Sequence, residues 1–134
     1  MCWSETATLA MVGLGSAATL VTWRRGESFS VWGTIGYFTV MEGLQAWGYG
    51  VVDQCGTPGN TTVTVLSYLH IAFQPIMINL FCLSLVGSAL DRRIRRQVLA
   101  LSTLASAAML ARLLPDTWFG ACPPGVPLCG PEFC

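Results

Sequence analysis

Two sets of polar residues recur at helical spacing within otherwise apolar stretches of the sequence. The first set is Glu42, Gln45 and Tyr49, and the second set is Ser67, His70 and Gln74. Both follow the spacing i, i+3 and i+7, which places each set on one face of a helix. His70 is the only histidine of the chain. A histidine beside a carboxylate can hold a ligand, carry a proton or act as a general base, so these two faces form the candidate site.

The helices that must position these residues are long and apolar enough to cross a membrane. Hydrophobic residues make up 53% of the 134 residues and charged residues only 10%, whereas soluble domains carry about 25% charged residues. A membrane-crossing helix needs about 20 mostly apolar residues. Four segments meet this requirement, and none has the charged face that a helix of a soluble bundle would need. We therefore expect spans at residues 6–23, 29–52, 62–87 and 97–114.

These spans predict an all-α integral membrane protein, a four-helix bundle formed by a single transmembrane domain over residues 1–114. Residues 115–134 hold five prolines and three cysteines. Proline at that density excludes a regular helix. We expect this segment to be a Cys/Pro-rich loop on the extracytoplasmic face.

The arginines set the expected orientation. All seven basic residues are arginines and they balance seven acidic residues, so no net charge attracts nucleic acid, and no nucleic-acid partner is expected. Six arginines lie between expected spans, namely Arg24, Arg25, Arg92, Arg93, Arg95 and Arg96. Short basic loops stay in the cytoplasm. We therefore expect both Arg-rich loops to be cytoplasmic and both termini to be extracytoplasmic.

Depth in the membrane suggests that the two polar faces meet. At 1.5 Å per residue, Glu42 lies about 15 Å and His70 about 12 Å from the outer ends of their spans. A buried, isolated glutamate is costly, so we expect Glu42 to pair with His70 while Gln45 and Gln74 complete the hydrogen bonds. Pro75 should kink the third span beside this pair and open a small pocket toward the outer side.

Three functions are compatible with such a site. The first is binding of a lipophilic or protonatable ligand, for which a quinone, a lipid or a pigment would fit, with the protein acting alone or as a subunit of a larger membrane complex. The second is an intramembrane enzyme with His70 as general base and Glu42 orienting it. The third is a structural accessory subunit whose partners are other helices or a second copy of the chain. The cofactor stays unassigned, and a single histidine argues against haem.

Five cysteines fall on the expected outer side and are disulfide candidates, namely Cys2, Cys55, Cys122, Cys129 and Cys134. The sixth, Cys82, lies within the third span. Disulfides persist in extracytoplasmic compartments, in agreement with this orientation. No CxxC pair is present, so no metal site is expected.

Small residues predict which faces pack. In the first span they are Ala7, Ala10, Gly13 and Ala17, and in the second Gly33, Gly36, Gly43 and Gly50. A weaker face on the fourth span comprises Ser102, Ala105, Ser106 and Met109. Close backbone approach at small residues supplies much of the attraction between membrane helices, so we expect these faces to form the helix contacts.

Three stretches carry a family resemblance. They are Met1-Cys2-Trp3-Ser4, the segment from Tyr68 to Asn79 with the sequence YLHIAFQPIMIN, and the segment PGVPLCGP at residues 124–131. Together they resemble a family of uncharacterised small multi-pass membrane proteins. The resemblance implies the membrane topology and transfers no activity. It also implies that members continue into further hydrophobic sequence, so we expect this chain to be a fragment or a shortened form.

Overall fold

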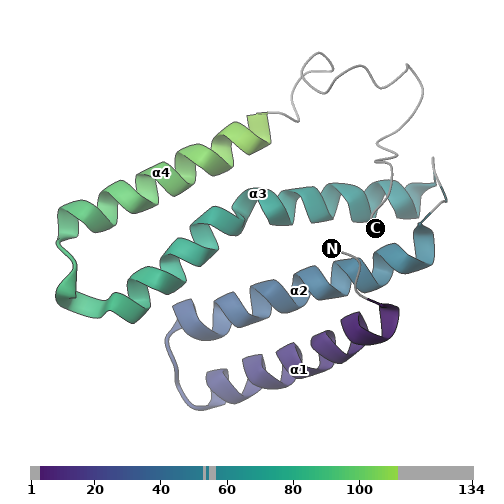
Figure 1. Ribbon diagram of the computed structural model, residues 1–134, viewed down its shortest axis with the longest axis horizontal. Coiled ribbons are helices and arrows are strands. Elements are labelled where there is room, and N and C mark those ends of the chain that lie inside the picture. The colour runs from purple at the N-terminus through teal and green to yellow at the C-terminus, as the bar shows by residue number, and fades with distance from the viewer. Residues whose placement is uncertain (1–3, 53, 55–56, 112–134) are drawn as a thin grey trace.

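A computed structural model describes residues 4–52, 54 and 57–111, and these residues are all-helical without a strand. The helices are α1 (Glu5–Arg24), α2 (Phe29–Val51), α3 (Pro58–Val86) and α4 (Arg92–Ala111), with a short 3₁₀ turn η1 (Gly87–Ala89) after α3. Figure 1 shows the four helices running antiparallel to their chain neighbours. The all-α prediction and the number of helices are confirmed for this part of the chain.

The four helices lie in an open row. Among the described residues, α1 contacts α2, α2 contacts α3 and α3 contacts α4, while α1 and α4 do not meet. Figure 1 shows α1 and α4 at opposite edges of this row. Short connections keep consecutive helices adjacent, but no central apolar core draws the two edge helices together.

The distribution of side chains is the reverse of that in a soluble protein. The buried side chains are mostly polar or small: Thr8, Thr34, Val63, Ser67, His70, Ala72, Leu83, Ser102 and Ser106. Large apolar side chains are exposed on every helix, including Leu14, which is 68% exposed on α1, Phe38 on α2, Phe73 on α3 and Leu101, which is 68% exposed on α4. Helices in this fold therefore meet along seams of small and hydroxyl-bearing residues.

Most hydroxyls near these seams are satisfied within their own helix. Thr34 donates to the carbonyl of Ser30 at 2.7 Å, and Ser102 donates to the carbonyl of Val98 at 2.8 Å. Such bonds to the preceding turn let a hydroxyl be buried without a partner on the neighbouring helix. Thr8 and Ser106 are exceptions, because their buried hydroxyl oxygens have no hydrogen-bond partner among the described residues.

The helices α3 and α4 begin about one turn before the predicted spans at residues 62 and 97. α3 begins at Pro58, because the Thr57 side chain accepts a hydrogen bond from the backbone N–H of Asn60 and proline suits the first helical position. α4 begins at Arg92, because the carboxylate of Asp91 accepts from the backbone N–H of Arg93 at 3.2 Å. Arginine is a good helix former, so the second arginine cluster lies on the first turns of α4 and not in a loop.

By length and composition, α1 and α3 are the two described helices that could cross a membrane. α4 falls short because its first five residues include four arginines, Arg92, Arg93, Arg95 and Arg96. α2 contains Glu42 and Gln45 together with several glycines, which lower its apolar character. Each of the four predicted spans is therefore a helix, and two of the described helices, α1 and α3, are long and apolar enough to cross a membrane.

Several predictions concern residues outside the described part of the chain. The five disulfide candidates Cys2, Cys55, Cys122, Cys129 and Cys134 lie there, and so does the Cys/Pro-rich segment 115–134. Cys82 is described and is a free, exposed cysteine on α3.

Candidate functional site

The most enclosed ionisable side chain is His70 on α3, and Tyr37 on α2 covers it. The two rings stack with their centroids 3.7 Å apart and an angle of 19° between their planes. The Tyr37 hydroxyl donates a hydrogen bond to the backbone carbonyl of His70. His70 is 9% exposed, and its Nε2 is buried without a hydrogen-bond partner among the described residues. The site is thus a clamped imidazole with one unused nitrogen.

The sequence around His70 explains its position. Val63 and Ser67 precede His70 at helical spacing and are buried as well, and Gln74 follows and is half-buried. These residues share one face of α3. The predicted stripe of Ser67, His70 and Gln74 therefore exists as a stripe in the fold, with its first two members enclosed.

Pro75 lies in the interior of α3 just beyond this stripe, and Figure 1 shows α3 changing direction partway along its length. Proline has no backbone N–H, so the carbonyl of Ile71 loses its helical donor. Asn79 Nδ2 donates to the carbonyl of Pro75 at 2.8 Å, one turn further along, and so does not replace the donor that the Ile71 carbonyl lacks. The helix is consequently weakened within two turns of His70.

The structure does not join Glu42 to His70. No hydrogen bond or ion pair connects them, and the place expected for Glu42 is taken by Tyr37. At 3.6 residues per turn, Glu42 lies about 140° around α2 from Tyr37, so it does not share the face that meets α3. Glu42, Gln45 and Tyr49 are all half-buried and follow another side of α2.

Tyr37 is the site residue that sequence reasoning missed. Ser67, His70 and Gln74 follow one another at intervals of three and four residues. Tyr37, in contrast, has the apolar residues Val40 and Met41 three and four positions later. The available signal was its position, because Tyr37, Met41, Leu44 and Gly48 recur at helical spacing and form a second stripe on α2.

The seam between α1 and α2 is built from reciprocal glycine and threonine contacts. A methyl group added at Gly15 would stand 2.2 Å from Oγ1 of Thr39, and one added at Gly36 would stand 3.3 Å from Cγ2 of Thr19. A glycine of each helix therefore packs against a threonine of the other helix. Of the small residues predicted to pack here, Gly36 lies in the seam, whereas Gly13 and Gly43 meet nothing within 4 Å.

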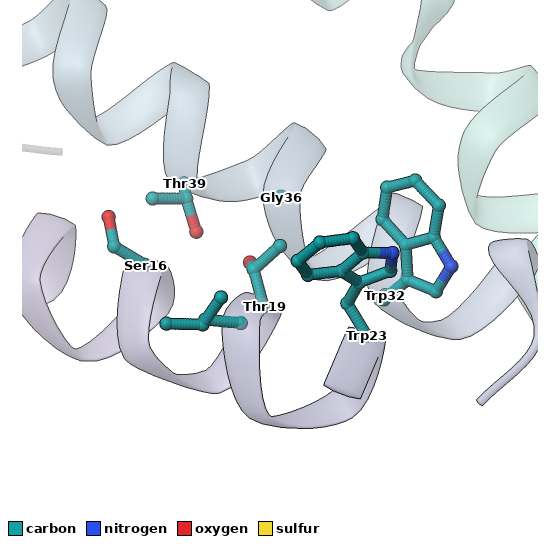
Figure 2. A pocket seen from close by; sticks show the side chains of 7 residues that line it. Ser16, Thr19, Trp23, Trp32, Gly36 and Thr39 are labelled. Carbon is teal, nitrogen blue, oxygen red and sulfur yellow. The ribbon is translucent and has the colours of Figure 1, made fainter. Parts of the chain in front are cut away.

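A cleft of about 550 Å³ opens beside this seam. It is lined by Ser16, Thr19, Leu20, Trp23, Trp32, Gly36 and Thr39. Figure 2 shows Trp23 and Trp32 at one end of the cleft and Ser16 and Thr39 toward the other. This cleft lies between α1 and α2, whereas the predicted pocket lies between the second and third helices.

The helices α3 and α4 contact each other along a seam at the edge of the row opposite to α1. The Tyr68 hydroxyl donates to the carbonyl of Met109 at 2.6 Å. Ser102 and Ser106 are buried on α4, as the predicted packing face requires, while Ala105 of that face is exposed. The fourth helix is thus fixed to α3 by one tyrosine and a pair of serines.

Chemically, the site around His70 offers one buried hydrogen-bonding atom. Its free Nε2 can donate or accept one hydrogen bond. In the described part of the chain, no three His, Cys, Asp or Glu side chains lie close enough to hold a metal ion.

Fold and site together define an all-helical protein with a polar interior seam and an apolar exterior. The chain belongs to a family of unknown function, DUF5765, whose family model matches residues 6–134. This agrees with the resemblance to an uncharacterised family. No curated protein and no solved structure matches the chain.

Proposed function

We propose that this chain is an integral membrane protein whose four helices all cross the bilayer. The observation that carries the proposal is the inverted distribution of side chains: among the described residues, hydroxyls and His70 are buried between helices, while 19 large apolar side chains are exposed. In water such a surface would drive aggregation. In a bilayer the same side chains face lipid, and helices associate through small residues and hydroxyls.

The arginines support a cytoplasmic position for one end of the row. Figure 1 shows the α1–α2 turn and η1 at the same end, where Arg24 and Arg25 follow one another and the first turns of α4 carry four more arginines. Arginines at a helix end can extend to the membrane surface. Basic segments stay in the cytoplasm, so the N-terminus lies on the extracytoplasmic side.

Thiol labelling tests membrane insertion. A cysteine is introduced at one of two positions, Phe73 or Glu27, in a variant in which every native cysteine has been replaced by serine. Phe73, on α3, is 43% exposed, and Glu27, in the α1–α2 turn, is exposed too. We expect a membrane-impermeant maleimide to miss Phe73→Cys from either side of the membrane and to label it only in detergent. Glu27→Cys should react with the same maleimide once the membrane is permeabilised and the reagent reaches the cytoplasmic side. Equal labelling of both in intact membranes would mean that α3 is surrounded by water.

We further propose that the protein binds a lipophilic ligand at His70. A buried imidazole nitrogen without a partner is unfavourable, and a membrane interior offers little water to satisfy it. A ligand with a carbonyl or hydroxyl group, as in a quinone, a lipid or a pigment, would supply the missing hydrogen bond. The Pro75 kink supports access, because it weakens α3 next to this nitrogen.

Substitution of His70 tests ligand binding. We expect His70→Leu, which keeps bulk and removes the ring nitrogens, to abolish copurification of a lipophilic compound measured by solvent extraction, absorbance and mass spectrometry. Ser84→Ala is the matched control on α3, because its hydroxyl bonds to the carbonyl of Phe81 in its own helix. Glu42→Gln should also retain the compound, because Glu42 faces another side of α2.

The opposite result has a definite meaning. If His70→Leu lowers only the thermal stability and the extracted compounds do not change, His70 is a structural clamp. The protein is then better described as a structural subunit, whose open edges α1 and α4 would receive partner helices or a second copy.

A further inference from the structure

The cleft between α1 and α2 presents carbon atoms although hydroxyl residues line it. Thr19 donates its hydroxyl to the carbonyl of Gly15 at 2.8 Å, and Thr39 donates to the carbonyl of Ile35 at 2.8 Å. Both threonines therefore use their donors inside their own helices, and Leu20 with the two tryptophans completes a mostly apolar lining. A volume of about 550 Å³ is in the range of small-molecule sites, and this lining suits an apolar occupant.

The end of the cleft at the α1–α2 turn has a different character. Trp23 is the penultimate residue of α1, and Trp32 lies in the first turn of α2. Exposed Arg24 and Arg25 follow Trp23 directly, and Glu27 is the single acidic residue of the turn. Tryptophan is enriched where hydrocarbon meets lipid headgroups, and arginine there attracts anionic lipid.

We propose that this cleft binds one acyl chain of an acidic phospholipid, with the headgroup phosphate held by Arg24 and Arg25. The carbon-lined wall fits the chain, and the charge of the turn is complementary to the headgroup. The assignment rests on the proposed membrane insertion, since it places the α1–α2 turn at the membrane surface. It is independent of ligand binding at His70, which lies on the seam between α2 and α3.

The second arginine cluster provides a matched comparison. Neither arginine pair lines the cleft, but Arg24 and Arg25 directly follow Trp23, which does. Arg92 and Arg93 are exposed at the same end of the row on the first turn of α4, which in the described part of the chain contacts α3 and neither helix of the cleft. If the positive charge at this end of the row attracts acidic lipid without a specific site, the preference for acidic lipid should depend on both arginine clusters. Binding in the cleft should depend on Arg24 and Arg25 alone.

Tryptophan quenching by brominated lipid measures occupancy. The protein carries Trp3→Phe, Trp47→Phe and Trp118→Phe, so that only the two cleft indoles emit, and it is reconstituted in unlabelled phosphatidylcholine. We expect a small fraction of brominated phosphatidylglycerol to quench more strongly than the same fraction of brominated phosphatidylcholine. Arg24→Gln and Arg25→Gln should each reduce this preference about fivefold, whereas Arg92→Gln with Arg93→Gln should leave it intact.

A second pair of variants tests the cleft itself. Ser16 lines it and its neighbour Ala17 does not, and both are exposed on α1. Ser16→Phe should fill the cleft and remove the preference for acidic lipid, while Ala17→Phe adds the same ring elsewhere and should retain it. Equal quenching by both lipids, or equal effects of the two arginine pairs, would overturn the assignment. Failure of membrane insertion would be visible separately, as labelling of Phe73→Cys from the aqueous side.

Discussion

Gly15→Ala should lower the free energy of unfolding by about 2 kcal/mol, the middle of the range for overpacking a close contact. The new methyl would stand 2.2 Å from Oγ1, 3.1 Å from Cβ and 3.2 Å from Cγ2 of Thr39. Rotation of the threonine relieves this overlap only in part, because its Cβ is fixed by the backbone at 3.1 Å and its hydroxyl would lose the hydrogen bond to the carbonyl of Ile35. The helices α1 and α2 would have to separate. Titration with SDS, followed by circular dichroism, measures the loss.

Gly13→Ala is the matched control on the same helix. No atom lies within 4 Å of its added methyl group, so stability should stay the same or rise by less than about 1 kcal/mol, the difference in helix propensity between alanine and glycine. If both substitutions cost the same, the loss would reflect glycine in general and not the contact with Thr39.

A double substitution identifies the contact. Thr39→Ala removes Oγ1 and Cγ2, the two atoms that rotation of the threonine can move, and leaves Cβ. Combined with Gly15→Ala, it should recover at least about 1 kcal/mol relative to the sum of the single effects, which is in the range for residues in direct contact. Strict additivity would show that the two side chains do not meet.

The sequence is sufficient to predict helices and insufficient to predict which of their faces meet. Long apolar runs and the breaks between them specify four helices, since both features are local. The helix starts at Pro58 and Arg92 lie outside the predicted spans, because proline and glycine, or a cluster of arginines, next to an apolar run are typical of a loop. In each case a single capping side chain, Thr57 or Asp91, decided the boundary.

The sides on which neighbouring helices contact each other cannot be predicted from residue spacing alone. Glu42 and His70 were paired because both are ionisable and lie at similar depth, yet a helix can turn any side toward its neighbour. Which side α2 presents to α3 follows from the whole seam, in which Tyr37 stacks on His70. Likewise, glycine spacing suggested Gly13, whereas the contact uses Gly15, because a threonine on the facing helix fills the space above it.

The seam between α2 and α3 allows its two interactions to be separated. Tyr37→Phe removes the hydroxyl that donates to the His70 carbonyl and keeps the ring that stacks on the imidazole. Tyr37→Leu removes both. We expect losses of about 1 kcal/mol for Tyr37→Phe and about 2 kcal/mol for Tyr37→Leu, since an aromatic pair adds about 1 kcal/mol.

Nuclear magnetic resonance can follow this site without sequence assignment, because His70 is the only histidine. With histidine labelled by ¹⁵N, the imidazole protons should be shifted upfield by the stacked ring of Tyr37. That shift should survive Tyr37→Phe and disappear in Tyr37→Leu. Tyr68→Phe is the control, because its hydroxyl donates to the Met109 carbonyl on the other side of α3, so the imidazole signals should not move. An unshifted imidazole in the unmodified protein would contradict the stack, and with it the enclosed nitrogen on which ligand binding at His70 depends.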